Sequence, residues 1–315
     1  MPELDEFGRI ARFFAPLASG FPGALGLTDD AALLAPPPGE ELVVTTDALV
    51  AEVHFRNQDP PDLVARKALR VNLSDLAAKG ARPICYTLAT VLPASCDETW
   101  LAAFTRGLAA DQAEFGIDLA GGDSARTTGP LVLSITAIGS VPLGKAIRRA
   151  GARPGDRVYV SGTIGDGALG LEALAGRLAD DGSLADRYLL PRPRLALGRA
   201  LRGRATAALD VSDGLVADLG HIAETSGVAL TIEAERVPLS AAARAALAKE
   251  PALLATVLSG GDDYELAFTA SEDLPQEIAG VPVACIGRVN GGRGVSVLDR
   301  RGEPVTLSTE GYRHF

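Results

Sequence analysis

Apolar and polar positions in the first half of the chain predict alternating strands and helices. The segments 41–50 and 83–93 are runs of β-branched and apolar residues, typical of buried strands. Between them, residues 61–79 repeat apolar positions at helical spacing, begin beside two prolines and stop at Gly80. The same criteria predict an amphipathic helix at 5–18, a helix at 97–115, a short strand and loop at 116–124, and a long strand at 130–141.

The second half repeats this organisation after a break. Residues 142–156 are rich in Gly, Pro and Arg, which indicates a linker or domain boundary. Beyond it we expect strands at 157–162, 207–212, 228–234, 264–269 and 281–289, and helices from the turn at 163–167 to about 178, at 213–227 and across 240–258. The pattern therefore predicts two α/β-type domains, residues 1–145 and 146–315.

The length and the net charge of the chain restrict the number of domains and the classes of partner that are compatible with it. A chain of 315 residues is long enough for two domains that each bury a core. The net charge is -10, from 30 Lys and Arg against 40 Asp and Glu. Because phosphate backbones require a basic face, this balance disfavours nucleic acid as a partner. A phosphorylated ligand remains compatible if metal cations mediate its binding.

The remaining composition favours a cytoplasmic protein. The first residues mix charged and apolar side chains at helical spacing, unlike a signal peptide. No apolar run approaches the ~18 residues that a membrane span requires, so we expect no membrane contact. Cys85, Cys96 and Cys285 form no zinc-type spacing, and the three histidines are scattered.

Aspartates recur at similar places along the chain. Asp47 follows an apolar strand pattern, Asp123 follows two glycines, and Asp210 and Asp213 close the run "ALDVSD". Comparable positions hold Asp29, Asp30, Asp75, Asp262 and Asp263. Carboxylates at strand ends can converge on the crevice where open α/β sheets bind ligands. Oxygen ligands without His or Cys favour Mg²⁺, and Thr45 and Thr46 offer further hydroxyl or carbonyl oxygens.

Each of these acids alone has a simpler explanation. Asp29, Ser74, Asp75, Ser212 and Asp213 stand where helices could begin, so each could be an N-cap worth ~1 kcal/mol. The Gly-Gly-Asp segments could be ordinary turns. Capping explains neither an aspartate inside "VVTTDALV" nor the number of coincidences.

Other nucleotide-binding signatures are missing from the sequence. It contains no P-loop and no protein-kinase motif set. The segment "SGTIGDGALGL" places glycines before a predicted helix and could hold a phosphate. Such a pattern is more often a tight strand-to-helix turn.

The motifs taken together resemble the thiamine-monophosphate kinase family. They are, in chain order, "TDDAAL", "VVTTDALVAEVHF", "RKALRVNLSDLAAKGARP", "GGDSAR", "RRAGARPGDRVYVSGTIGDGALGL", "LDVSDGL", "SGGDDYELAF" and "GYRHF". The family belongs to an ATP-binding superfamily with aminoimidazole ribonucleotide synthetase and selenophosphate synthetase. The resemblance implies an α+β fold. Its N-terminal domain would bind ATP and Mg²⁺ and pair its sheet across a homodimer, and its C-terminal domain would be α+β.

The resemblance also implies a reaction, in which ATP phosphorylates thiamine monophosphate to thiamine diphosphate. The matching metal-binding positions are Asp30, Thr45, Thr46, Asp47, Asp75, Asp123, Asp210 and Asp213. Positions that match ATP contacts are Gly122, Asp123, Arg149 and Ser212, and those that match thiamine phosphate contacts are His54, Asp262 and Tyr312. The chain departs from the family at Glu52, where a glycine is frequent, and at Asp262, where a glutamate is common.

The implied reaction needs no dedicated catalytic base, because the acceptor phosphate oxygen is already ionised. Several Mg²⁺ ions would offset the repulsion between the phosphates, and Arg149 would clamp those of ATP. His54 would orient the acceptor phosphate, and Tyr312 would stack on the thiamine ring. Without the motif, His54 would be an ordinary surface or core histidine, Arg149 a solvated linker residue and Tyr312 an aromatic anchor of the chain end.

Several alternatives to the kinase remain. Selenophosphate synthetase should carry a reactive cysteine near its start, and the hydrogenase-maturation relative should end in one, unlike this chain. An enzyme like aminoimidazole ribonucleotide synthetase is harder to exclude. A Mg²⁺-dependent phosphohydrolase would release phosphate from ATP without an acceptor. A non-catalytic nucleotide sensor would not require so many carboxylates.

Overall fold

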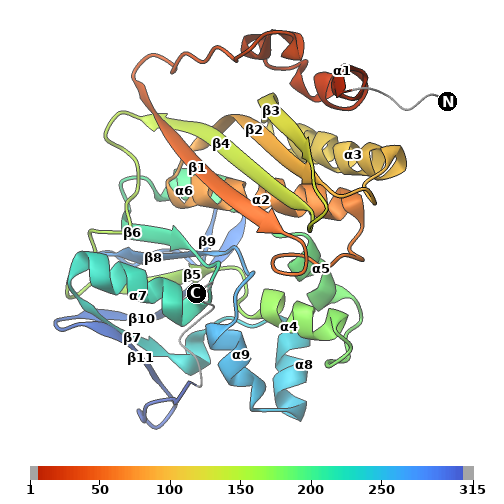
Figure 1. Cartoon of the computed structure of the whole chain (residues 1–315). Coiled ribbons are helices and arrows are strands. Elements are labelled where there is room, and N and C mark those ends of the chain that lie inside the picture. The colour runs from red at the N-terminus through yellow and green to blue at the C-terminus, as the bar shows by residue number, and fades with distance from the viewer. Residues whose placement is uncertain (1–5, 308–315) are drawn as a thin grey trace. The chain divides into compact units, whose positions relative to one another are not determined.

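The computed structural model describes residues 6–307, and the chain separates into two compact units (Figure 1). The N-terminal unit comprises Met1–Leu76 and Arg82–Gly144, and the C-terminal unit comprises Ala77–Ala81 and Lys145–Phe315. The change from one unit to the other falls inside the Gly- and Pro-rich segment.

A four-stranded sheet forms the centre of the N-terminal unit. Its strands are β1 (Glu40–Val50), β4 (Val132–Pro142), β2 (Arg82–Leu92) and β3 (Asp118–Arg126), in that order. β4 pairs antiparallel with β1 and β2, and only β2 and β3 are parallel. Leu133, Ile135 and Ala137 alternate along β4 and are fully buried, as expected for a strand with one face on the core.

Two long helices cover one face of this sheet (Figure 1). α2 (Pro61–Ala78) begins at a proline and buries Leu69, Leu73 and Leu76, which repeat at helical spacing. α3 (Glu98–Phe115) is capped by Asp97, whose carboxylate accepts a hydrogen bond from the Trp100 N–H at 2.8 Å. Both predicted helices are confirmed.

The other face of the sheet is open along β1. Leu42, Val44, Thr46 and Ala48 alternate along this strand and are exposed, with Val44 62% exposed. The prediction of a buried strand at 41–50 is therefore wrong in its burial. The helices α2 and α3 cover only the opposite face of the sheet (Figure 1).

The predicted helix at 5–18 is instead three short pieces. α1 (Glu6–Arg9) runs into a π-helical turn, η1 (Ile10–Phe14), and a 3₁₀ turn, η2 (Ala15–Ala18). Pro16 lacks the N–H that a continuous α-helix needs at this position. A further 3₁₀ segment, η3 (Pro22–Leu27), leads into the loop that carries Asp29 and Asp30.

The C-terminal unit contains a larger mixed sheet. Its order is β11 (Gly294–Leu298), β7 (Ala229–Glu233), β10 (Val281–Asn290), β5 (Arg157–Ser161), β8 (Leu266–Ala270) and β6 (Ala205–Asp210), with the short β9 (Glu277–Ile278) beside β10. All of these ladders are antiparallel except β7 with β11.

Helices and turns complete this unit. They are α4 (Asp166–Leu174), α5 (Ser183–Leu189), α6 (Leu195–Leu201), α7 (Leu215–Ser226), η4 (Ala234–Arg236), α8 (Ala241–Lys249) and α9 (Leu253–Ser259). α7 packs on the sheet through the fully buried Leu215, Leu219 and Ile222. The sequence pattern did not predict α5, α6, β9 or β11, which are all seven residues or shorter.

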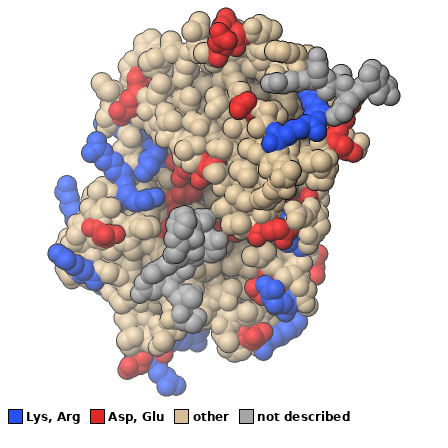
Figure 2. Space-filling model, in the orientation of Figure 1, with Lys and Arg blue, Asp and Glu red and all other residues tan. Residues whose placement is uncertain are grey.

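Within the described residues, no helix is long and apolar enough to cross a membrane. Figure 2 shows both acidic and basic side chains on the pictured face of a chain whose net charge is -10.

Candidate functional site

Two carboxylates of the N-terminal unit, Asp47 and Asp75, lie close to one another. Thr45 and Asp47 occupy alternate positions of β1 and so share one face of the strand, and the Thr45 hydroxyl donates to Oδ2 of Asp75 on α2. Burial, and then the charge of Asp75, raise the pKa of Asp47 to about 6. Within residues 6–307 neither carboxylate forms an ion pair, so both charges lack a positive partner.

The structure shows that several of the residues considered as helix N-caps do not cap a helix. Ser74 and Asp75 lie near the end of α2 rather than at its start. α7 begins after Gly214, which leaves Ser212 and Asp213 outside the cap position. Asp29 lies in a bend with no helix directly after it, and its carboxylate accepts a hydrogen bond from the Asp30 N–H at 2.8 Å.

Asp47 and Asp123 lie inside their strands, so their expected position at strand ends is wrong. The β1–β4 ladder continues past Asp47 to Val50, and β3 continues past Asp123 to Arg126. Because the sheets are largely antiparallel, the crevice rule for open parallel sheets does not describe this molecule. The predicted convergence of all the acids on one crevice stays a prediction, because the acids divide between the two units.

Thr46 lies on the opposite face of β1 from Thr45 and Asp47. Its hydroxyl donates to the Ile135 carbonyl at 3.1 Å and accepts from the Thr136 hydroxyl at 3.0 Å. The Thr46 hydroxyl is therefore directed away from the carboxylate pair. Its main-chain carbonyl is the oxygen that remains to be considered as a ligand.

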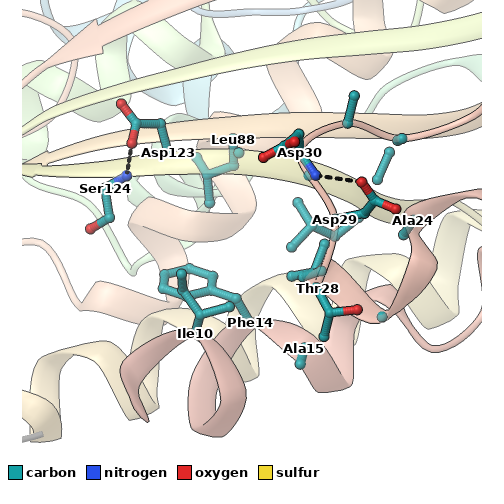
Figure 3. Close-up of a pocket in the computed structure, with 18 of the residues that line it drawn as sticks. Ile10, Phe14, Ala15, Ala24, Thr28, Asp29, Asp30, Leu88, Asp123 and Ser124 are labelled. Atoms are coloured by element: carbon teal, nitrogen blue, oxygen red, sulfur yellow. Dashed lines mark hydrogen bonds between the residues drawn. The ribbon is translucent and has the colours of Figure 1, made fainter. Parts of the chain in front are cut away.

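A pocket of about 590 Å³ lies in the N-terminal unit (Figure 3). Apolar side chains line one part of it, including Phe7, Ile10, Phe14, Leu88 and Leu119. Thr28, Asp29, Asp30, Gly122, Asp123 and Ser124 line another part. The pocket thus brings together an early loop and β3, which are far apart in the sequence. An apolar surface beside carboxylates can accept a flat ring that carries metal-bound phosphates.

Gly122 has a structural reason to be glycine. A Cβ on this residue would lie 2.0 Å from the Leu88 carbonyl oxygen, so a side chain would push β3 away from β2. Beside it, Asp123 accepts a hydrogen bond from the Ser124 N–H at 2.8 Å. The close strand packing places the backbone of Gly122 and the Asp123 carboxylate on the pocket wall.

His54 has a fixed ring orientation in the turn after β1. Its Nδ1 accepts a hydrogen bond from the Val50 N–H at 3.0 Å, and its backbone N–H donates to the Val50 carbonyl at 2.9 Å. Because Nδ1 is an acceptor, Nε2 carries the proton of the neutral ring. The histidine can therefore donate a hydrogen bond through Nε2.

A second acidic group lies in the C-terminal unit, where β6 meets α7. Asp210 ends β6 and is 7% exposed. The N–H groups of Ser212 and Asp213 both donate to Oδ2 of Asp218, each at 3.0 Å. Burial, and then the charge of Asp210, raise the pKa of Asp218 well above its usual value.

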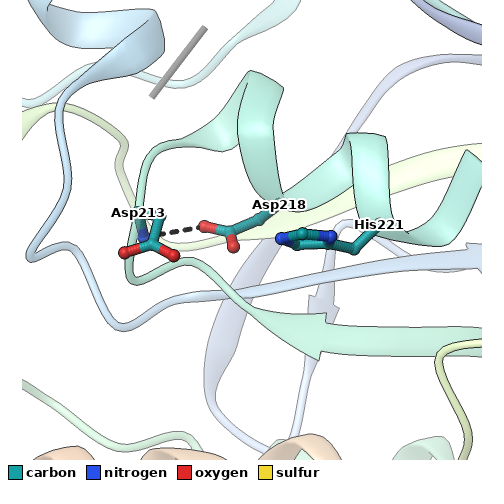
Figure 4. A group of neighbouring side chains, drawn as sticks. All are labelled: Asp213, Asp218 and His221. Atoms are coloured by element: carbon teal, nitrogen blue, oxygen red, sulfur yellow. Dashed lines mark hydrogen bonds between the residues drawn. The ribbon is translucent and has the colours of Figure 1, made fainter. Parts of the chain in front are cut away.

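Figure 4 shows Asp218 between Asp213 and His221. One ligand atom from each of these three residues lies within 4.8 Å of the others. Sequence reasoning missed Asp218 and His221. Their spacing of three residues on one helix face was the available signal.

The segment "GGDDYE" lies against this acidic group. The Asp262 N–H donates to the Ser212 carbonyl at 2.9 Å, and the Tyr264 N–H donates to the Val211 carbonyl at 2.7 Å. Asp262 and Tyr264 both have positive φ, 70° and 52°, a strained conformation that is frequent in functional loops. Asp262 is thereby held next to Ser212.

Asp263 is a structural acid. It is buried, and its carboxylate accepts hydrogen bonds from Gly165 N–H at 2.7 Å and Gly167 N–H at 3.0 Å. Burial raises its pKa to about 8. The glycine turn that could hold a phosphate is thus already occupied by a carboxylate of the chain, and the tight-turn explanation is correct.

Glu265 is a second structural acid, with no exposed surface. It accepts hydrogen bonds from the Ser161 hydroxyl at 2.6 Å, Arg187 Nη2 at 2.9 Å and Arg194 Nε at 2.7 Å. Two guanidinium groups therefore neutralise this carboxylate inside the fold.

Arg149 is exposed in the segment that runs beside β6. The preceding carbonyl, that of Arg148, accepts a hydrogen bond from the Ala208 N–H at 2.9 Å. Tyr312, which was predicted to contact thiamine phosphate, lies outside the described residues.

Comparison with known proteins identifies the family. Residues 28–141 match the family model "AIR synthase related protein, N-terminal domain", and residues 153–300 match the corresponding C-terminal domain. The chain is 48% identical to the thiamine-monophosphate kinase of Caulobacter vibrioides, over 98% of this chain and 90% of that protein. The chain belongs to the thiamine-monophosphate kinase family.

Solved structures of thiamine-monophosphate kinases have the same fold. The enzyme from Stenotrophomonas maltophilia K279a superposes with a TM-score of 0.80 at 46% identity, covering 89% of this chain and 91% of that one. A structure of AaThiL complexed with AMPPCP and TMP gives a TM-score of 0.79 at 32% identity, covering 91% of each chain. The resemblance inferred from the motifs is confirmed.

The positions predicted for a thiamine-monophosphate kinase fall into local groups. Asp30, Gly122 and Asp123 line the pocket of the N-terminal unit, and Thr45, Asp47 and Asp75 form the pair between β1 and α2. Asp210, Ser212, Asp213 and Asp262 meet around the start of α7. His54 lies in the turn after β1, and Arg149 lies in the segment beside β6.

Proposed function

We propose that this chain transfers the γ-phosphoryl group of ATP to thiamine monophosphate, giving thiamine diphosphate and ADP. The observation that carries the proposal is the relative complexed with AMPPCP and TMP, which aligns with 91% of this chain at 32% identity. The geometry supports it, because both units hold groups of neighbouring acids beside loops able to contact phosphates.

The acids fit Mg²⁺. Their donor atoms are carboxylate, hydroxyl and carbonyl oxygens, which this ion prefers. Burial, and then the charge of Asp75, raise the pKa of Asp47, so a bound cation would stabilise the charged form of both carboxylates. We assign Mg²⁺ binding to Asp30, Thr45, Thr46 through its carbonyl, Asp47, Asp75, Asp123, Asp210 and Asp213. Bound Mg²⁺ would neutralise the charge of the phosphate oxygens.

The pocket of the N-terminal unit is suited to a nucleotide. Its apolar wall can pack against a base, while Gly122 brings the backbone close to the ligand. In the C-terminal unit, Ser212 and the exposed guanidinium of Arg149 are proposed to bind ATP phosphates, the latter as a bidentate clamp.

Thiamine monophosphate is proposed to contact His54, Asp262 and Tyr312. The Nε2 proton of His54 would donate to the acceptor phosphate and orient it, since Nδ1 is engaged by Val50. The attacking phosphate oxygen is already ionised, so no residue is assigned as a general base. Transfer then depends on positioning and charge neutralisation.

The open face of the N-terminal sheet supports a homodimer. Leu42 and Val44 of β1 are exposed on this face, and exposed apolar strand residues commonly mark an interface. We propose that two copies pair their sheets here, in the cytoplasm.

Product analysis tests the proposal. Purified protein with Mg²⁺, ATP and thiamine monophosphate should form one ADP per thiamine diphosphate. ADP released equally fast without thiamine monophosphate would favour the phosphohydrolase. No turnover with or without this acceptor would favour a sister enzyme such as one like aminoimidazole ribonucleotide synthetase.

A further inference from the structure

The hydroxyl of Ser226, at the end of α7, holds the segment that follows Arg149. Its Oγ accepts hydrogen bonds from the Gly151 N–H at 3.1 Å and the Ala152 N–H at 3.2 Å. A hydroxyl oxygen has two lone pairs, so it can accept both. Ala152 is 5% exposed, which leaves its N–H poorly placed to find water instead.

The segment is also fixed on the other side of Arg149. The Arg148 carbonyl accepts from the Ala208 N–H at 2.9 Å. At Gly151 the backbone has φ 137°, and a Cβ there would lie 2.3 Å from the Thr206 carbonyl. Hydrogen bonds to β6 and to α7 therefore bracket the residue between them.

Arg149 itself depends on this backbone for its position. It is exposed, and within the described residues its side chain forms no ion pair or hydrogen bond. A long, unpaired side chain samples many rotamers, so the direction of its guanidinium follows from where its Cα is held. Loss of the hydrogen bond at Gly151, two residues away, would widen the range of positions that the guanidinium samples.

We propose that Ser226 is a positioning residue that holds Arg149 for ATP. This inference rests on the proposed function, in which Arg149 clamps the phosphates of ATP. Each end of α7 would then hold a segment that binds the nucleotide. The loop that carries Ser212 and Asp213 is tied to Asp218 near its start, and the arginine segment is tied to Ser226 at its end.

Steady-state kinetics of Ser226→Ala tests the proposal. We expect KM for ATP to rise roughly three- to tenfold, the change that the net worth of one ordinary hydrogen bond produces. KM for thiamine monophosphate should stay within twofold. Ser226→Thr, which keeps the hydroxyl, should restore the wild-type KM for ATP.

Thr225→Ala is the matched control. Its hydroxyl donates to the His221 carbonyl of its own helix at 2.6 Å and does not hold the arginine segment. This variant should leave both KM values unchanged. An equal rise in KM for ATP in Thr225→Ala would mean that any substitution at this end of α7 weakens ATP binding. That result would overturn the proposal.

A double-mutant cycle separates positioning from general packing. If Ser226 acts through Arg149, then Ser226→Ala should have no further effect on KM for ATP in an Arg149→Ala background. An undiminished effect there would overturn the proposal. So would a Ser226→Ala protein that melts at a lower temperature yet keeps its KM for ATP.

The same variants remain informative if the wild type proves inactive on thiamine monophosphate. That result would defeat the proposed function alone. Calorimetric titration with Mg²⁺ and a non-hydrolysable ATP analogue would then compare wild type, Ser226→Ala and Ser226→Thr directly. Weaker binding by Ser226→Ala alone supports the positioning role, and equal binding by all three refutes it.

Discussion

Two pairs of acids in this protein have opposite surroundings. In the N-terminal unit, the partly buried Asp47 and Asp75 lie close to one another, and the Thr45 hydroxyl donates to Asp75. In the C-terminal unit, Asp263 receives two backbone N–H groups and Glu265 receives two arginines. The second pair has hydrogen-bond donors from its own chain, whereas the first has no ion-pair partner within residues 6–307.

The difference shows how a structural carboxylate differs from a ligand carboxylate. Burying a charge is costly, so a structural acid is accompanied by donors from its own chain. An acid without such donors weakens the empty protein and is stabilised only when a cation arrives. Total burial is therefore a poor guide to function here, since the more deeply buried of the two pairs is the structural one.

The largest effect is expected on stability, from Glu265→Gln. The amide turns a donor toward guanidinium groups that need an acceptor, which leaves Arg187 and Arg194 poorly compensated. Removing one partner of a buried ion pair costs about 3–5 kcal/mol, so the free energy of unfolding should fall by about this amount. Denaturant titration measures it. A variant that unfolds normally but loses turnover would place Glu265 among the ligands instead.

Asp47→Asn and Asp75→Asn should have the opposite outcome. Each should reduce turnover at least ~100-fold, because a lost metal ligand leaves phosphate repulsion uncompensated. The metal-free protein should melt at the same temperature or higher, since one of two repelling charges is gone. Asp97→Asn in the same unit is the control, because asparagine caps a helix as well as aspartate does. If Asp47→Asn or Asp75→Asn lowers the melting temperature and leaves turnover normal, the comparison is contradicted.

The pH dependence of stability should distinguish the two pairs. Both Asp47 and Asp263 have a folded pKa above the ordinary value of 3.8, about 6 and about 8 respectively. The folded state therefore holds extra protons, and the stability they contribute is lost as pH rises through each folded pKa. Between pH 6 and 8 the loss assigned to Asp263 is on the order of 2 kcal/mol.

Urea unfolding at a series of pH values checks this dependence. Asp263→Asn should reduce the decline between pH 6 and 8, and the amount that this substitution removes should be the same with and without Mg²⁺. Mg²⁺ should instead suppress the decline at lower pH, where Asp47 titrates. If Mg²⁺ abolishes the part of the decline that Asp263→Asn removes, Asp263 belongs with the ligands.

The smallest effects should come from the neighbouring threonines. Thr45→Val removes the hydroxyl beside Asp75, and the loss of one hydrogen bond should lower turnover several-fold, or ~1 kcal/mol. Thr46→Val should change turnover less than twofold, because its hydroxyl lies on the other face of β1 and valine keeps the carbonyl. Steady-state kinetics on both variants decides which side of the strand matters. Equal losses would contradict the assignment.

Local signals made much of the fold predictable. A proline start and regular apolar spacing identified α2, and apolar spacing identified α3. Burial of β1 was misjudged, because a run of β-branched residues does not reveal that one face of its sheet is uncovered. The helix at 5–18 failed at Pro16, a signal that was present in the sequence.

The candidate site was predictable as a set of residues but not as an arrangement. The acids could be found from their recurrence and from the family motifs. Whether an acid binds a ligand or supports the fold depends on partners distant in the sequence, as Asp263 with Gly165 shows. Asp218 was missed for the same reason, since its role arises only when α7 turns it back toward Ser212.

The Asp263 carboxylate, which accepts hydrogen bonds from Gly165 and Gly167 at the start of α4, has a consequence for ligand selectivity. Asp263 is tethered to the chain, so it competes for the glycine N–H groups at a high effective concentration that no dissolved phosphate matches. Nucleotides and free phosphate in the cell are therefore kept from a turn whose sequence would suit them. The Asp263 side chain therefore blocks phosphate binding at this glycine turn, and no further contact is needed to exclude phosphate from it.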